Sequence, residues 1–192
     1  MNEKLLSDYI DIATKIIADN YNPDNCIVSA RIAMEVFDNW HLKVKPLTVK
    51  VSIFNKLYSD KGAAPADEEE AKKWIDEGAW SVIVGDRTEK NPQKWHGHLV
   101  SLIDKYMIDT SVIQANRPNK NILVDPIVAE LKDSEFKSGK NNIVFNMNGS
   151  TMFYTVFPDD TSFMKHKDWW DVHACKNVVK DIISEMNRRK KK

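Results

Sequence analysis

The chain has few cysteines and no net charge, and each lack excludes a class of protein. Only two cysteines, Cys26 and Cys175, occur among 192 residues. A disulfide framework normally has more, so each cysteine needs its own explanation. The 28 basic and 28 acidic residues cancel. No global field would therefore recruit nucleic acid or an anionic membrane surface, and a nucleic-acid partner is not expected.

Long apolar runs are also lacking. None approaches the roughly 20 residues that a membrane-spanning helix needs. The stretch from Met1 to Lys15 is amphipathic and charged, unlike a signal peptide. These features predict a cytoplasmic protein with no membrane partner. We expect a single domain over residues 1–187 and a basic, disordered tail over 188–192.

Hydrophobic periodicity predicts two helices at the start of the chain. Apolar residues recur at helical spacing over 3–19. After a break rich in turn formers, Asp24 or Asn25 can cap a second helix that runs to about Trp40. The later pattern predicts strands over 47–54, 80–84, 97–103, 106–113, 142–147 and 152–156, and helices over 67–78, around 125–132 and over 173–186. Helices followed by mostly antiparallel strands make an α+β layout.

Cys26 lies in the first turn of the second predicted helix. The helix dipole and the free N–H groups of a first turn stabilise a thiolate, which is the nucleophilic form of cysteine. The alternative is a small core residue, because Cys26 continues an apolar stripe with Ala30, Ala33 and Phe37. Position alone does not distinguish the two.

His98 opens a predicted strand that is apolar on both faces. If residues 104–105 form a two-residue turn, Asp109 pairs with Val100 and shares a face with His98, one diagonal step of about 7–8 Å away. A three-residue loop would instead place Asp109 on the opposite face. The relation between the two side chains therefore depends on the turn.

Asp109 stands in an otherwise apolar strand and needs a partner. A buried carboxylate costs several kcal/mol unless it is paired, and an imidazole N–H would pair it. Such a carboxylate fixes the tautomer and orientation of a histidine base. The alternative is an aspartate that caps a turn at the strand end.

The order of a cysteine opening a helix, a histidine on one strand and an aspartate on the next resembles the papain-like superfamily. The nearest branch is the transglutaminase-like and arylamine N-acetyltransferase-like group, and the resemblance covers about residues 20–115. It implies a papain-like fold, with helices packed on an antiparallel sheet, and a triad of Cys26 as nucleophile, His98 as base and acid, and Asp109 as orienting acid. The approach to Cys26, residues 22–25, matches neither the Arg-Gly-Gly of the acetyltransferases nor the Cys-Trp step of many transglutaminases.

The resemblance also implies a chemistry. A thiolate attacks the amide or thioester carbonyl of a protein or small-molecule substrate and forms a thioester acyl-enzyme. Water would complete a peptidase, amidase or deamidase reaction, and an amine would complete a transglutaminase or acyltransferase reaction. The triad needs no metal or organic cofactor.

Five further residues are weaker candidates for binding the substrate. The side-chain amides of Asn25 and Asn55 are candidates for an oxyanion hole. Trp95 precedes the histidine strand and is a candidate wall of the site, while Gln114 and Asn116 follow the aspartate strand and are candidates to line a cleft. The alternative for the polar residues is a solvated loop, and for Trp95 it is the core.

Two other functions compete with the triad. His96 and His98, spaced for one face of a strand, with Asp109 would supply three metal ligands, which requires His96 to lie within the strand. A protein-binding module without chemistry is the second, because segment 165–171 places aromatic residues between charges and the basic tail suits an anionic partner. Cys175 is expected to be a core thiol.

Overall fold

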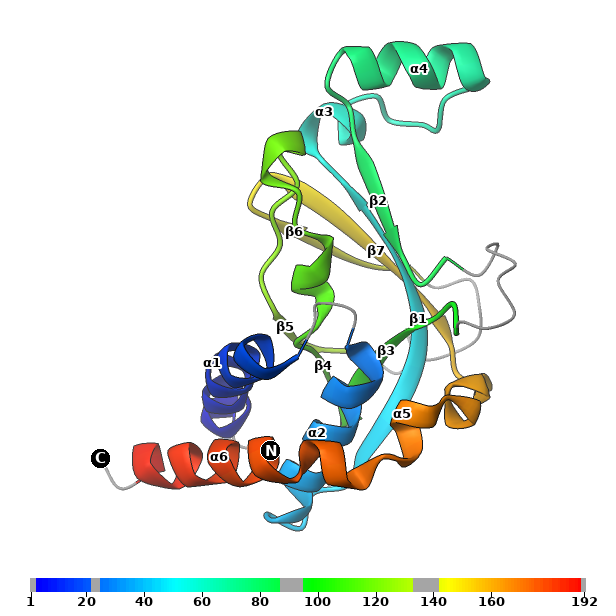
Figure 1. Cartoon of the computed structure of the whole chain (residues 1–192). Coiled ribbons are helices and arrows are strands. Elements are labelled where there is room, and N and C mark those ends of the chain that lie inside the picture. Colours follow the sequence, from blue (N-terminus) through cyan, green and yellow to red (C-terminus); the bar gives the residue numbers. More distant parts are fainter. Residues whose placement is uncertain (1–2, 22–24, 87–94, 133–141, 191–192) are drawn as a thin grey trace.

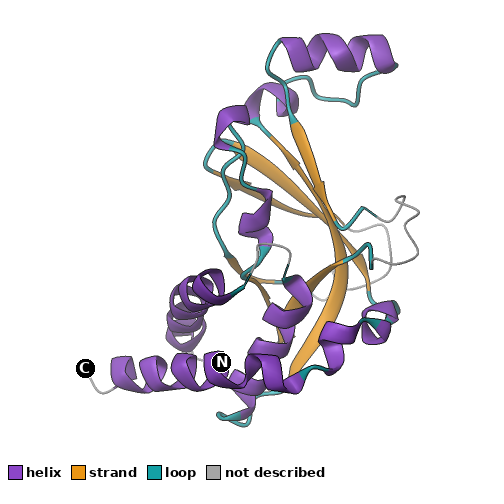
Figure 2. Cartoon of the chain, viewed as in Figure 1, coloured by secondary structure: helices purple, strands orange, loops and turns teal. Residues whose placement is uncertain are grey.

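A computed structural model describes residues 3–21, 25–86, 95–132 and 142–190. It has an α+β architecture, in which the N-terminal helices pack on a curled antiparallel sheet (Figures 1 and 2). The predicted fold class is confirmed at this level. None of the helices within the described residues is both long enough and apolar enough to cross a membrane.

Three helices gather at one end of the molecule (Figure 1). They are α1 (Glu3–Asn20), α2 (Cys26–Asp38) and α6 (Val172–Lys190). Each presents one apolar face, as the periodicity predicts, and these faces meet in a core cluster that includes Tyr9, Phe37 and Ile182. Helix α2 also packs on strands β1 and β3, which brings its first turn to the sheet.

Strand β1 (Val44–Phe54) is the centre of the sheet. One of its edges pairs with β3 (His98–Ile103) and then with β2 (Ser81–Val84), and its other edge pairs with β7 (Ser150–Phe157). The sheet continues through β4 (Tyr106–Asp109) to β5 (Ile127–Glu130) on one side and ends at β6 (Asn142–Met147) on the other. Side chains such as Val49, Val51 and Ile53 are fully buried, so β1 forms the spine of the second core cluster.

Both predicted hairpins are present. Ile103 lies opposite Tyr106, which confirms the two-residue turn at 104–105. Asn148 and Gly149 join β6 to β7 with φ angles of 51° and 77°, as expected for a turn that needs two residues with positive φ.

Three predicted boundaries are wrong. The strand expected over 106–113 ends at Asp109 because that side chain caps the following turn, and a 3-10 helix, η1 (Val112–Ala115), comes next. The short helix expected around 125–132 is strand β5, since a short apolar run does not distinguish the two. The last helix, expected over 173–186, continues to Lys190, and residues 191–192 of the expected tail lie outside the described residues.

Ion pairs explain why the basic end of α6 stays helical. Arg188 pairs with Glu185 at 2.6 Å on the same helix, and Arg189 reaches Asp11 of α1 at 3.3 Å. The final turn therefore has partners on two helices.

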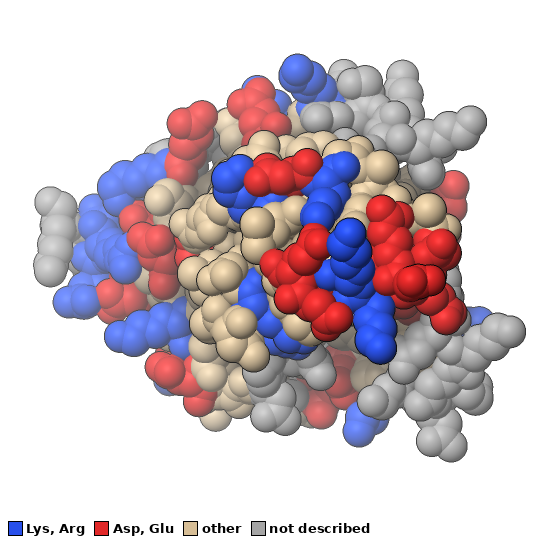
Figure 3. Space-filling model, turned by 90° about the horizontal axis from the view of Figure 1, so that it is seen from above, with Lys and Arg blue, Asp and Glu red and all other residues tan. Residues whose placement is uncertain are grey.

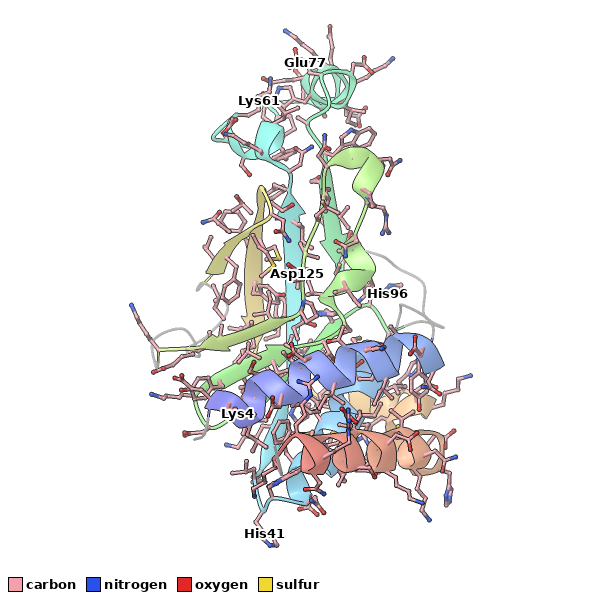
Figure 4. The ribbon with its side chains drawn as sticks, turned by 90° about the vertical axis from the view of Figure 1, so that its left-hand side faces the viewer. Lys4, His41, Lys61, Glu77, His96 and Asp125 are labelled. Carbon is pink, nitrogen blue, oxygen red and sulfur yellow. The ribbon has the colours of Figure 1, made fainter. Side chains whose placement is uncertain are left out.

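Two short helices occupy the end of the sheet opposite α1, α2 and α6 (Figure 1). They are α3 (Lys56–Ser59) and α4 (Glu68–Asp76). Lys61 and Glu77 form an ion pair of 2.5 Å there (Figure 4). Seen from this end, acidic and basic side chains are intermixed (Figure 3). The remaining short elements are η2 (Pro118–Lys120), η4 (Ser162–Lys165) and α5 (Lys167–Trp170).

Candidate functional site

The start of α2 meets the start of β3. Cys26 is the first residue of α2, after Asn25 at the cap position, and His98 is the first residue of β3. Ile27 and Ala30 of α2 pack with Leu99 of β3 in a third apolar cluster. This packing fixes the thiol and the imidazole next to each other.

The His98 imidazole and the Asp109 carboxylate form a buried pair. Nε2 of His98 lies 2.7 Å from Oδ2 of Asp109, and both side chains are 0% exposed. The two-residue turn places both residues on one face, and the ladder from Ile103–Tyr106 through Ser101–Ile108 sets their offset. Because a carboxylate only accepts, Nε2 carries a proton and donates it.

Asp109 is also a capping residue. Its Oδ1 atom accepts hydrogen bonds from the Ser111 N–H at 3.1 Å, the Ser111 hydroxyl at 3.2 Å and the Val112 N–H at 2.9 Å. Its Oδ2 atom accepts a hydrogen bond from the Tyr154 hydroxyl at 3.0 Å, in addition to the one from His98. The two explanations that the sequence left open, capping and pairing, therefore both apply, one to each oxygen.

The pair changes the proton affinity of His98. Burial alone would lower the pKa of the imidazole, but the charge of Asp109 and its hydrogen bond raise it, with a further contribution from Cys26, to about 10. At neutral pH the imidazole therefore holds its proton.

Cys26 lies against the other side of the imidazole. Its thiol is close enough to contribute to the raised pKa of the imidazole. Since Nε2 faces Asp109, the nitrogen left for the sulfur is Nδ1. Nε2 of Gln114, in η1, lies 3.3 Å from the same Nδ1 atom. Cys26 is partly exposed and packs at the margin of the third apolar cluster, whereas His98 and Asp109 are buried.

A pocket of about 560 Å³ opens over this group. Cys26, His98 and Gln114 border it, together with Asn25 and Trp95. The Trp95 indole N–H donates to the Ser162 hydroxyl at 2.9 Å, which holds the ring in place as a wall. Asn25 accepts a hydrogen bond from the Ser29 hydroxyl at 2.7 Å. Three of the five weaker candidates therefore border the same pocket as Cys26.

The other two weaker candidates lie elsewhere and need correction. Asn55 is 1% exposed, and its amide bonds the backbone of Tyr58, Gly78, Trp80 and Lys120. Asn116 bonds both backbone groups of Val124. Neither borders the pocket. Both are loop asparagines whose side-chain amides hydrogen-bond backbone groups. The sequence alone does not distinguish such an amide from one that faces a ligand.

His96 does not share the strand with His98. Strand β3 begins at His98, and His96 lies before it on the border of the pocket (Figure 4). Within the described ranges, no three His, Cys, Asp or Glu side chains lie close enough together to hold a metal ion. The strand geometry that a metal site would need is therefore not present.

The segment that the sequence marked as a binding surface also reaches the pocket. His166 and Asp168 border it, while Trp170 is 67% exposed and donates its indole N–H to the Met164 carbonyl at 2.6 Å. Trp169, in contrast, is buried in the third apolar cluster. Of these two adjacent tryptophans, Trp169 therefore belongs to the core and Trp170 to the surface.

The structure adds two residues that the sequence did not reveal. Gly85 has a φ of 76°, and a Cβ atom there would lie 2.6 Å from the backbone nitrogen of His98 and 2.9 Å from the Val49 carbonyl. Only glycine permits that approach. Tyr154 reaches Asp109 from β7. No local sequence pattern predicts that either residue lies at the site, although the alternation of β7 does predict that Tyr154 points inward.

The fold and site together define an α+β protein with a buried histidine–aspartate pair and a neighbouring cysteine at a pocket. Comparisons with protein-family models, curated proteins and solved structures found no match to this chain.

Proposed function

We propose that this protein is a cysteine-dependent acyl-transfer enzyme in which Cys26, His98 and Asp109 act as a triad. The observation that supports the proposal most strongly is the imidazole of His98, which has the Asp109 carboxylate on one nitrogen and the Cys26 thiol beside the other. Two buried, hydrogen-bonded ionisable groups beneath an open pocket are costly to bury, which favours a chemical role over a packing role.

The geometry supports a specific sequence of steps. The proton of Cys26 passes to Nδ1 of His98, and the raised pKa of the imidazole favours that ionised pair. The thiolate attacks the substrate carbonyl carbon and a C–S bond forms. The imidazolium gives its proton to the leaving amine or thiol as the bond to that group breaks, which leaves a thioester on Cys26.

The second half of the reaction releases the acyl group. His98 takes a proton from a water molecule or an amine in the pocket, and that nucleophile attacks the thioester carbonyl. The C–S bond breaks and the thiolate returns. Water as acceptor makes the enzyme a peptidase, amidase or deamidase, and an amine makes it a transglutaminase or acyltransferase. Asp109 keeps the imidazole oriented throughout.

The proposal extends to the family. The arrangement of a thiol at a helix start and a His–Asp pair on neighbouring antiparallel strands is similar to the transglutaminase-like branch of the papain-like superfamily. The support is the order of the three residues along the chain and the α+β layout around them.

A generic acyl donor tests the proposal. Full-length protein is incubated with the acetyl thioester of N-acetylcysteamine and the adduct is located by mass spectrometry. We expect acetylation of Cys26 in the native protein, loss of the adduct in Cys26→Ala, and acylation slowed about a hundredfold in His98→Ala. Addition of hydroxylamine would give acetyl hydroxamate as the acyl-enzyme resolves. Acetylation of Cys26 no faster than that of an unfolded-state cysteine would overturn the proposal.

A further inference from the structure

The buried Asp109 carboxylate has a fourth neighbour that the triad does not include. Tyr154 is fully buried on β7, and its hydroxyl donates to Oδ2 of Asp109 at 3.0 Å. Oδ2 is the same oxygen that accepts the N–H of His98. The tyrosine and the histidine therefore share one acceptor atom.

The contact is long-range in both sequence and sheet order. Strands β1 and β3 lie between β7 and β4, so the curl of the sheet brings the hydroxyl to the carboxylate. The ring of Tyr154 packs edge-on against Phe145, with ring centroids 5.6 Å apart and planes at 85°. Residues opposite it on the neighbouring strands are Val51 and Ile143. These apolar neighbours fix the ring of Tyr154 and so orient its hydroxyl toward Asp109.

We propose that Tyr154 is a positioning residue of this site, whose hydroxyl holds the Asp109 carboxylate in place and directed at His98. The inference rests on the proposed function, because the state that it protects is the charged imidazole that faces Cys26.

The physical reason lies in the two oxygens. Oδ1 is fixed by three donors from residues 111 and 112, which set the plane of the carboxylate. Oδ2 faces His98, and the Tyr154 hydroxyl is the neutral donor that stabilises its charge. Without that donor the carboxylate is held less firmly against His98, and the charged imidazole beside Cys26 is stabilised less. The reactivity of Cys26 would then be lost first at the acidic end of its pH profile.

The test measures alkylation of Cys26 by iodoacetamide as a function of pH in wild type, Tyr154→Phe and Tyr9→Phe. Tyr9 is the matched control, since it is equally buried and its hydroxyl has no hydrogen-bond partner among the described residues. We expect the acidic limb of the rate profile to move about one pH unit upward in Tyr154→Phe, because one hydrogen bond to a charged group is lost. At a pH on that limb the rate would fall about tenfold, and Tyr9→Phe would keep the wild-type profile.

A second variant guards against failure of Tyr154→Phe to fold. Difluorotyrosine at position 154 alone keeps the ring and strengthens the hydroxyl as a donor, so the acidic limb should move to lower pH. A structural role would lower thermal stability and leave the limb in place, and that result in either variant would overturn the inference. Wild-type Cys26 that shows no fast alkylation at all would instead refute the proposed function, so the two failures are distinguishable.

Discussion

The two cysteines occupy opposite environments, although both stand near the start of a helix. Cys26 is partly exposed, borders the pocket and contacts the imidazole of His98. Cys175 is 0% exposed and lies in the cluster formed by α1, α2 and α6. Burial raises the pKa of its thiol, as does the charge of Glu35. A position near a helix start therefore does not distinguish the two cysteines. The His98–Asp109 pair beside Cys26 does.

The largest expected effect concerns stability and pH. The pKa of His98 is about 10 in the folded protein against a reference of 6.5. Because the folded value is raised, the stabilisation from the charged imidazole is fully present below about pH 6.5 and is lost as the pH rises through about 10. Denaturant unfolding should give wild type a larger free energy of unfolding than His98→Asn. That difference should shrink by several kcal/mol from acidic to alkaline pH.

A histidine at an exposed turn provides the control for that measurement. His41→Asn removes a histidine at the end of the molecule far from α3 and α4 (Figure 4). It separates the loss of any histidine from the loss of the buried pair. A gap between wild type and His98→Asn that stays constant with pH would contradict the charged pair.

The next effect concerns the carboxylate. Asp109→Asn keeps the shape of the side chain but removes the charge that partners His98, and an amide cannot accept from all the donors around it. We expect a loss of about 3 kcal/mol in the free energy of unfolding and slower alkylation of Cys26, with Cys175 unchanged. In the matched variant Asp125→Asn, an exposed carboxylate bonded to Asn148 is replaced, and the cost should stay within about 0.5 kcal/mol. Equal costs for the two variants would argue against a special role for Asp109.

The smallest effect concerns a glycine beside the site. Gly85→Ala and Gly149→Ala both place a side chain at a positive φ, of 76° and 77°, which costs about 1–2 kcal/mol each. Only the first also pushes on the backbone of His98, since nothing lies within 4 Å of a Cβ atom at Gly149. Thermal denaturation should show a larger loss for Gly85→Ala, and alkylation of Cys26 should slow in that variant alone. A reactivity of Cys26 equal to wild type would show that the site tolerates the displacement.

The sequence predicted the elements that carry the site better than the loops around it. The two-residue turn at 104–105 follows from the alternation of two apolar strands, and that turn was enough to relate His98 to Asp109. Strand β5 was wrongly predicted as a helix, because three apolar residues and a glutamate are too short a run to show a distinguishing period. The shorter end of β4 depends on the capping bonds of Asp109, which are visible only in three dimensions.

Contacts between distant parts of the chain explain the remaining misses. Tyr154 reaches Asp109 across the curl of the sheet, and Gly85 lies against the backbone of His98, which is 13 positions away in the sequence. No local pattern predicts either contact. Asn55 and Asn116 show the converse, because their loop positions suggested a cleft while their amides satisfy the backbone. The sequence therefore predicted candidate residues from their local patterns, but it did not predict the contacts that the curl of the sheet creates.

The most direct test of the central claim is the rate of iodoacetamide alkylation at the two cysteines, measured peptide by peptide across pH. We expect Cys26 to react far faster than Cys175 below pH 7, and His98→Ala to slow the reaction of Cys26 about a hundredfold. Equal, slow reaction of both cysteines in the folded protein would contradict the central claim.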